Sequence, residues 1–231
     1  MDKRVYRQVQ RIAKETMSYA ARHITAGMNL RDVRKMCEEK MLALGADCFW
    51  YWDIGAFVFA GDETAISVSG PKYATSDRIL APNDILTIDL SPQCGDTWGD
   101  YARTLILQNG TVVDTQDIQN AEWQQGLNME ALLHSELHRY ATPETTLETL
   151  HRHMNRLIGQ HGFCNLDFAG NLGHTIVRKK QDRVYIEKGS TLRLGDAGCF
   201  TFEPHIGLPG SHFGYKMENI YYFEDGVLQE L

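Results

Sequence analysis

The chain has 231 residues, of which 43% are hydrophobic and 23% are charged. This is enough apolar sequence for one sizeable core, which excludes a disordered chain. A formal net charge of −7, from 23 basic and 30 acidic residues, disfavours binding to nucleic acid phosphates. The polar N-terminus and the lack of a long apolar run disfavour export and membrane spanning, so we expect a cytoplasmic protein without a membrane partner.

Apolar residues at helical spacing predict two helices in the first part of the chain. The first extends to about Ile24, and the second runs from Leu30 to Leu44 and ends at Gly45. From Cys48 to about Ile106 the period changes to short β-prone runs separated by Gly, Pro, Asn and Asp. The predicted strands are 57–59, 65–68, 85–88 and 104–107.

The second part of the chain repeats this order. Helical spacing returns at about 114–140 and 147–161, and β-prone runs follow at 175–177, 184–186, 199–203 and 217–223. No linker-like stretch separates the two parts. We therefore expect one α+β domain over residues 1–231, made of two similar halves around a shared antiparallel sheet.

The cysteines are odd in number and include no Cys-x-x-Cys pair. They are Cys37, Cys48, Cys94, Cys164 and Cys199. This pattern favours reduced, mostly buried thiols over a disulfide framework or a zinc ribbon.

Two aspartates of the first half stand in or beside β-prone runs. Asp89 lies inside the apolar run 85–90, on the face opposite Ile88 and Leu90. Asp100 opens the returning strand after turn-forming Pro and Gly residues. A hairpin would bring the two carboxylates to the same end of adjacent strands.

Two glutamates and a histidine follow the same pattern in the second half. Glu203 ends an apolar strand, Glu218 lies on the returning strand, and His174 begins a β run between the two hairpins. Each acid alone would be an ordinary strand-end residue paired with Lys or Arg. Four buried carboxylates together would repel one another unless cations compensate them. An oxygen-rich set with one imidazole suits two divalent ions of Mn, Fe, Co or Zn.

The order of these motifs resembles the pita-bread metalloenzymes, which include aminopeptidase P, prolidase, creatinase and methionine aminopeptidase. The Arg-Thr pair after Asp100 and the segments around Glu203 and Glu218 are similar to the aminopeptidase P and prolidase branch. In the absence of an extra N-terminal domain, the chain looks more similar to methionine aminopeptidase. The matching segments are Ile88-Asp89, Asp100-Tyr101-Ala102-Arg103-Thr104, Gly173-His174, Phe200-Thr201-Phe202-Glu203-Pro204 and Gly214-Tyr215-Lys216-Met217-Glu218-Asn219.

The resemblance implies a pita-bread fold with two pseudo-symmetric halves around a curved antiparallel sheet. It also implies two divalent ions, with Asp89 on one ion, Asp100 and Glu218 on both, and His174 and Glu203 on the second. A water that bridges two metal ions becomes a nucleophile for amide hydrolysis. In this interpretation Glu203 is also the general base that accepts the proton of that water.

The chain departs from the family at positions that contact substrate there. Ser69 stands before Gly70-Pro71 where peptidases carry a histidine, and Lys180 or Gln181 replaces a second histidine. Lys216 stands for the usual Arg, and Asn219 stands where Asp is common. Metal binding is therefore better supported than peptidase specificity.

Two histidines close to Glu203 in the sequence, His205 and His212, are candidates for a substitute proton donor. The alternative is that each is an ordinary histidine of a surface loop. We include His205 with Glu203 as the predicted catalytic residues.

Three other features have less specific interpretations. The aromatic run Phe49-Trp50-Tyr51-Trp52, with Phe57 and Phe59, is either core or the wall of a pocket for a small apolar or ring-bearing substrate. Arg103 is expected to orient a carboxylate through a bidentate pair. His134 and His138, four residues apart on a predicted helix, are expected on a solvated face.

The favoured function is a dinuclear metallohydrolase that cleaves an amide or related C-N bond in a short peptide or a small molecule. The first alternative is a non-hydrolytic metalloenzyme on the same ligands, either a lyase or an oxygen-activating di-iron enzyme. The second is a pita-bread binding module without catalysis. A homodimer is a reasonable expectation for each.

Overall fold

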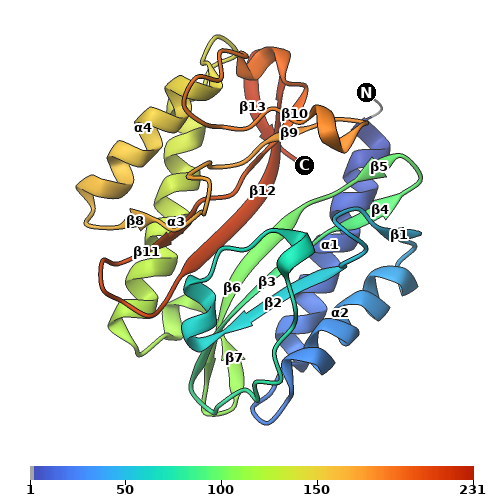
Figure 1. The fold of residues 1–231 in the computed structure, drawn as a ribbon, viewed down its shortest axis with the longest axis vertical. Coiled ribbons are helices and arrows are strands. Elements are labelled where there is room, and N and C mark those ends of the chain that lie inside the picture. The colour runs from blue at the N-terminus through green and yellow to red at the C-terminus, as the bar shows by residue number, and fades with distance from the viewer. Residues whose placement is uncertain (1–2) are drawn as a thin grey trace.

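Four α-helices flank a strongly curved sheet in the computed structural model, which describes residues 3–231 (Figure 1). Side chains that accept hydrogen bonds from the first turn begin three of the helices: Asn29, Asn120 and Thr146. The helices are α1 (Lys3–His23), α2 (Leu30–Ala43), α3 (Ala121–Tyr140) and α4 (Leu147–Gln160).

The main sheet is antiparallel and joins the two halves of the chain. Its central path is β2 (Ala56–Ala60), β3 (Asp84–Leu90), β6 (Tyr101–Gln108), β12 (Tyr215–Glu224), β10 (Cys199–Phe202) and β9 (Thr175–Ile176). Beside this path lie β7 (Thr111–Val113), β8 (Cys164–Asn165), β11 (His205–Gly207) and β13 (Val227–Glu230). A separate small sheet contains β1 (Cys48–Phe49), β4 (Pro92–Cys94) and β5 (Thr97–Trp98).

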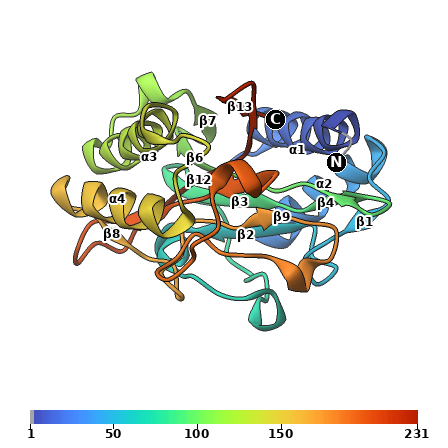
Figure 2. The same ribbon diagram turned by 90° about the horizontal axis from the view of Figure 1, so that it is seen from above.

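The sheet separates the hydrophobic core from the face that carries the site. Seen from above, α1 and α3 lie on one side of the sheet and the loop of residues 61–80 lies on the other (Figure 2). Helices α1 and α2 share one apolar cluster with β2 and β3, and α3 and α4 share another with β10 and β12. Along β3, Ile88 and Leu90 are fully buried in the core, whereas Thr87 and Asp89 line a pocket on the opposite face.

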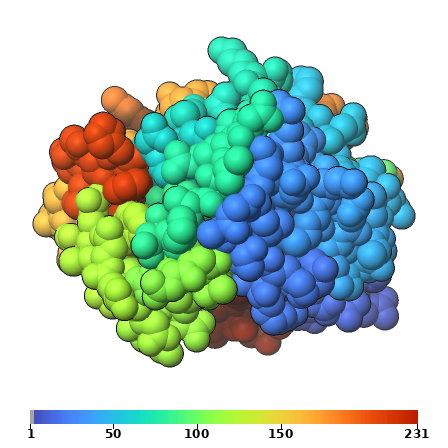
Figure 3. Space-filling model, turned by 90° about the horizontal axis from the view of Figure 1, so that it is seen from below, coloured from blue at the N-terminus to red at the C-terminus, as the bar shows by residue number. Residues whose placement is uncertain are grey.

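The loop of residues 61–80 lies between the first helices and the loop that precedes β12. In the view from below, this turquoise segment fills the space between blue α2 and the red segment near residue 210 (Figure 3). The Thr64 hydroxyl accepts a hydrogen bond from the Gly214 N–H at 3.0 Å. The two halves of the chain are thereby joined on the side of the pocket.

The predicted α+β class and the curved antiparallel sheet are confirmed, but three predicted segments differ. Residues 65–68 are not a strand, because the chain there leaves a 3-10 turn (Gly61–Ala65) whose backbone bonds to the other half. The helix predicted from about residue 114 begins at Ala121, after its cap Asn120. Residues 184–186 form only an isolated bridge, between Tyr185 and His174.

Two further expectations concern the cysteines and the hydropathy of the helices. All five cysteines are free, but only Cys37 and Cys199 are buried, so the prediction that most are buried is wrong. The other three lie in the short strands β1, β4 and β8, where they are exposed or only partly buried. No helix within residues 3–231 has the length and hydropathy needed to cross a membrane.

Candidate metal centre

Three carboxylates converge where β3, β6 and β12 lie side by side. Asp89 is in β3, Asp100 directly precedes β6, and Glu218 is in β12. Strand pairing places Ala102 opposite both Asp89 and Glu218, and Asp100 stands two residues before Ala102. One oxygen from each of the three carboxylates lies within 4.8 Å of the others. Such a group can hold a cation.

His174, which directly precedes β9, and Glu203, which directly follows β10, lie beside this group. His174 Nε2 lies 3.6 Å from Asp100 Oδ2 and 3.7 Å from Glu203 Oε1. The other ring nitrogen, Nδ1, lies 3.2 Å from the Thr175 carbonyl and would donate to it in the neutral ring. This tautomer leaves the Nε2 lone pair directed at the carboxylates, as a metal ligand requires.

Gly173 sets the position of His174. Its φ of +134° lies in a region that other residues rarely adopt, and an added Cβ would meet the Thr201 carbonyl oxygen at 2.4 Å. The close approach lets the His174 N–H donate to Thr201 Oγ1 at 3.0 Å. Any larger residue at position 173 would push the imidazole away from the carboxylates.

The electrostatics of the group favour a bound cation. Burial and the neighbouring carboxylates raise the pKa values of Asp100 and Glu218 well above their usual range. Burial lowers the pKa of His174 to about 3, so its imidazole is neutral at pH 7. Glu218 is fully buried, and neither of its carboxylate oxygens has a hydrogen-bond partner among the described residues. A divalent ion would satisfy these oxygens, so the residues present fit a metal.

Lys216 enters the same carboxylate group, a position that the sequence did not predict. Its ammonium Nζ lies 2.6 Å from Asp89 Oδ2, 3.0 Å from Glu203 Oε2 and 3.7 Å from Glu218 Oε2. Burial lowers the pKa of Lys216, but these three carboxylates outweigh it and raise the pKa well above the usual value. The lysine therefore lies among the predicted ligands as a charged group.

Two residues hold the backbone of the predicted ligands, and one of them corrects an expectation. Arg103 does not pair with a carboxylate: it donates to the backbone carbonyls of Ala102 and Glu218 and to the side chain of Asn219. The side chain of Gln10, buried in α1, donates to the Asp100 carbonyl at 2.7 Å. Sequence reasoning missed this contact, although a glutamine on the apolar face of the first helix is a signal that could have indicated it.

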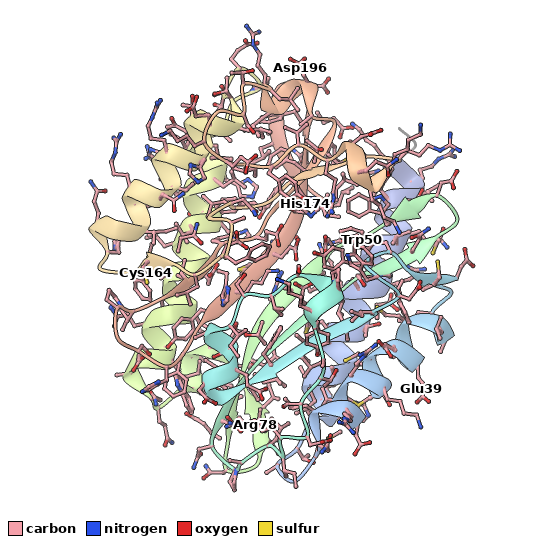
Figure 4. All side chains as sticks on the ribbon, in the orientation of Figure 1. Glu39, Trp50, Arg78, Cys164, His174 and Asp196 are labelled. Carbon is pink, nitrogen blue, oxygen red and sulfur yellow. The ribbon has the colours of Figure 1, made fainter. Side chains whose placement is uncertain are left out.

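The pocket beside the carboxylates has an aromatic wall. Trp50 lies edge-on to His174 with ring centroids 5.9 Å apart, and both labelled residues lie near the centre of the molecule (Figure 4). Of the predicted aromatic run, Phe49 packs against the core and Trp52 is 63% exposed. The aromatic residues that line the pocket are Trp50, Tyr51, Phe57, Phe59, Phe168 and Tyr185.

Arg183 is the basic residue of this wall. Its guanidinium lies 4.9 Å from the centroid of the Trp50 ring, and one of its nitrogens is 3.5 Å from His174 Nε2. No carboxylate of the described residues forms a salt bridge with Arg183, so its charge is available to a ligand in the pocket.

Of the other residues predicted to act near the substrate, His205 lines the pocket and the rest do not. Buried His205 lines the pocket, and its Nε2 lies 2.7 Å from the Thr64 carbonyl. Burial lowers the pKa of His205 to about 4, so the ring is neutral at pH 7 and donates that hydrogen bond. His212 and Gln181 are exposed, and neither they nor Ser69 line the pocket.

The expectation of a solvated helix face is wrong for one of the two histidines in α3. His138 is exposed, but His134 is buried, and its ring nitrogens lie within hydrogen-bond distance of the Tyr221 hydroxyl and the Met217 carbonyl. The reason is that α3 packs on β12, the strand that carries Glu218.

Comparisons with known proteins agree with this geometry. The model of metallopeptidase family M24 matches residues 4–225. The prolidase from Pyrococcus horikoshii OT3 superposes with a TM-score of 0.81 at 18% identity, covering 100% of this chain and 62% of that one. The X-Pro aminopeptidase from Thermotoga maritima MSB8 gives 0.79 at 19% identity, covering 97% and 59%. The Xaa-Pro dipeptidase from Bacillus anthracis gives 0.81 at 16% identity, covering 100% and 60%.

These likenesses to solved structures concern the fold. The chain spans less than two thirds of the length of these three structures. A comparison with curated proteins gives no match.

Proposed function

Because the chain belongs to metallopeptidase family M24, we propose that it is a metal-dependent hydrolase of the pita-bread fold, acting on an amide or related C-N bond. The observation that carries the proposal is the buried carboxylate group of Asp89, Asp100 and Glu218, with His174 Nε2 beside it. We further propose that residues 1–231 form one domain and that the protein is a cytoplasmic homodimer.

The candidate ligands for the metal are the five residues predicted from the sequence: Asp89, Asp100, His174, Glu203 and Glu218. Their oxygen-rich set with one imidazole suits Mn, Fe, Co or Zn. When bound, the metal supplies an acidified water and polarises the carbonyl of the substrate. The resemblance predicts two ions with a bridging water. Lys216 contacts three of the predicted ligands, so its positive charge affects whether both ions can bind.

Glu203 is the proposed general base. It lines the pocket, and its Oε1 accepts a hydrogen bond from Thr201 Oγ1 at 3.3 Å, which orients the carboxylate. A carboxylate between the metal ligands and the pocket is within reach of a nucleophilic water and of the substrate. His205 is the second proposed catalytic residue. In the neutral ring, the nitrogen that does not bond Thr64 carries no proton, so it would act by accepting one.

The proposed substrate is a short peptide or a small molecule with an apolar or ring-bearing group. The aromatic wall around Trp50 and Phe57 suits such a group. The structural relatives named above are an X-Pro aminopeptidase, a prolidase and an Xaa-Pro dipeptidase, so peptides with proline belong among the first substrates to test.

A second candidate is a non-hydrolytic metalloenzyme on the same ligands, a lyase or an oxygen-activating di-iron enzyme. Ser69 and Gln181, in place of the family's histidines, favour it because they remove groups that peptidases use on substrate. A binding module without catalysis is the third candidate, and the complete set of predicted ligands argues against it.

One experiment distinguishes these functions. Protein stripped with a chelator is reloaded with Mn²⁺, Co²⁺ or Fe²⁺ and assayed against short peptides, including Xaa-Pro dipeptides, and against small amides. We expect hydrolysis that disappears with the chelator and returns with metal. Loaded protein that hydrolyses nothing in this set would contradict the proposal, and oxygen consumption by the iron form would favour the second candidate.

A further inference from the structure

The most unusual feature of the site is that Lys216 shares the predicted metal ligands. Lys216 and Glu218 are two residues apart in β12, so both side chains point to the same face of the sheet. The ammonium nitrogen lies 2.6 Å from Asp89 Oδ2, 3.0 Å from Glu203 Oε2 and 3.7 Å from Glu218 Oε2. One lysine thus contacts oxygens assigned to both predicted ions.

The contacts of Lys216 divide the ligand atoms into two sets. The atoms near the ammonium are one oxygen each of Asp89, Glu203 and Glu218. On the other side is His174 Nε2, with Asp100 Oδ2 at 3.6 Å and Glu203 Oε1 at 3.7 Å from it. No other Lys or Arg of the described residues forms a salt bridge with these acids, so the ammonium is their resident positive charge.

On this basis, which depends on the proposed metal centre, we propose that the ammonium of Lys216 takes the place of the ion on the Asp89 side. The chain then binds a single divalent ion, on the side of His174. The charges are consistent with this arrangement. Four carboxylates carry −4, and one divalent ion with one ammonium leaves −1 in the group, whereas a second divalent ion would lie directly against the ammonium.

The groups that a metal would contact differ between the Asp89 side and the His174 side. A divalent ion on the Asp89 side must displace or repel a buried ammonium that makes a 2.6 Å contact with Asp89. An ion beside His174 takes a neutral imidazole nitrogen and carboxylate oxygens that the lysine does not contact. Lys216 acts through the ligands, so it is a positioning residue that also sets the number of ions.

The test is the number of Mn²⁺ ions bound by the full chain. Wild type and K216M are stripped, loaded with Mn²⁺, desalted and measured by elemental analysis and electron paramagnetic resonance. We expect about one ion per chain with an uncoupled spectrum for wild type, and about two with spin coupling for K216M. The control is K180M, whose lysine contacts the Trp50 carbonyl and none of the acids, and it should stay at about one.

Substitution of single ligands tests which side holds the ion. D89N should keep the one ion, and H174A should lose it. If K216M fails to fold, the wild-type count and these two variants still decide the matter. Two coupled ions in the wild type, or a K216M count that stays at one, would overturn the inference and leave the proposed hydrolase intact, whereas wild type without any bound ion would overturn both.

Discussion

The floor of the pocket and its rim are built in different ways. The floor consists of Asp89, Asp100 and Lys216, which lie in or directly beside paired strands whose register fixes their spacing. The rim consists of Trp50, Arg183 and the loop of residues 61–80, which come from turns and loops outside the main sheet. The floor carries candidate metal ligands, and the rim carries the aromatic residue Trp50 and the basic residue Arg183. The strands therefore determine the chemistry, while the loops determine which substrate reaches it.

The largest effect is expected at the floor. D100N removes the buried charge of a proposed metal ligand, so we expect loss of bound metal and a fall in kcat of about a thousandfold or more, because a metal supplies several kcal/mol to the transition state. Metal analysis and steady-state kinetics measure both. D225N is the matched control, since Asp225 is exposed in a turn with φ of 50°, which Asn also adopts. Full activity in D100N would remove Asp100 from the site.

The next effect separates two tryptophans of the same run. Trp50 is 4% exposed and packs against Trp98 with ring centroids 4.1 Å apart, whereas Trp52 is 63% exposed. W50A should lower the free energy of unfolding by about 3 kcal/mol, because it leaves a cavity. W52A should change it by about 0.5 kcal/mol or less. Chemical denaturation measures both, and equal losses would mean that the rim is not held by Trp50.

A pH-dependent effect is expected behind the floor, at His134. Burial lowers its pKa from 6.5 to about 3, so the unfolded chain takes up the proton first. Stability is therefore lost as the pH falls from 6.5 towards 3, with a slope of up to about 1.4 kcal/mol per pH unit from this group. H134Q should be less stable at pH 7, because its hydrogen bonds change, but should lose less stability on acidification.

The control for this slope is H138Q, whose histidine is exposed on the same helix. Denaturation at several pH values gives the slopes. An acid slope in H134Q as steep as that of wild type would contradict a buried neutral His134.

The smallest effect is expected at the rim. R183Q removes the guanidinium that no carboxylate of the described residues pairs with, so KM should rise about tenfold for substrates that carry a carboxylate. The control is R178Q, an exposed arginine that pairs with Asp96. Arg183 has two possible roles, binding the substrate and acting through His174, and steady-state kinetics distinguishes them. A fall in kcat with unchanged KM would mean that Arg183 acts through His174 and not on the substrate.

The sequence was sufficient to predict the elements that follow a strong local period. Helices α1, α2 and α4 and the strands around Asp89, Asp100, Glu203 and Glu218 were expected from spacing and turn residues. A carboxylate inside an apolar strand can also be recognised from its neighbours in the sequence. An unpaired buried charge is costly, so such a residue indicates a partner or a function. This explains why the candidate ligands could be selected from the sequence alone, with the family resemblance giving their order.

Tertiary contacts decided the remaining features. His134 looks like a surface residue by its neighbours in the sequence, and only the packing of α3 on β12 buries it. Arg103 stands close to an aspartate in the chain, yet strand pairing turns it to the backbone of Glu218. The position of Lys216 is of the same kind, since two of its three carboxylate partners come from other segments of the sheet. Local sequence sets the backbone period, but the pairing of distant strands determines which charges meet.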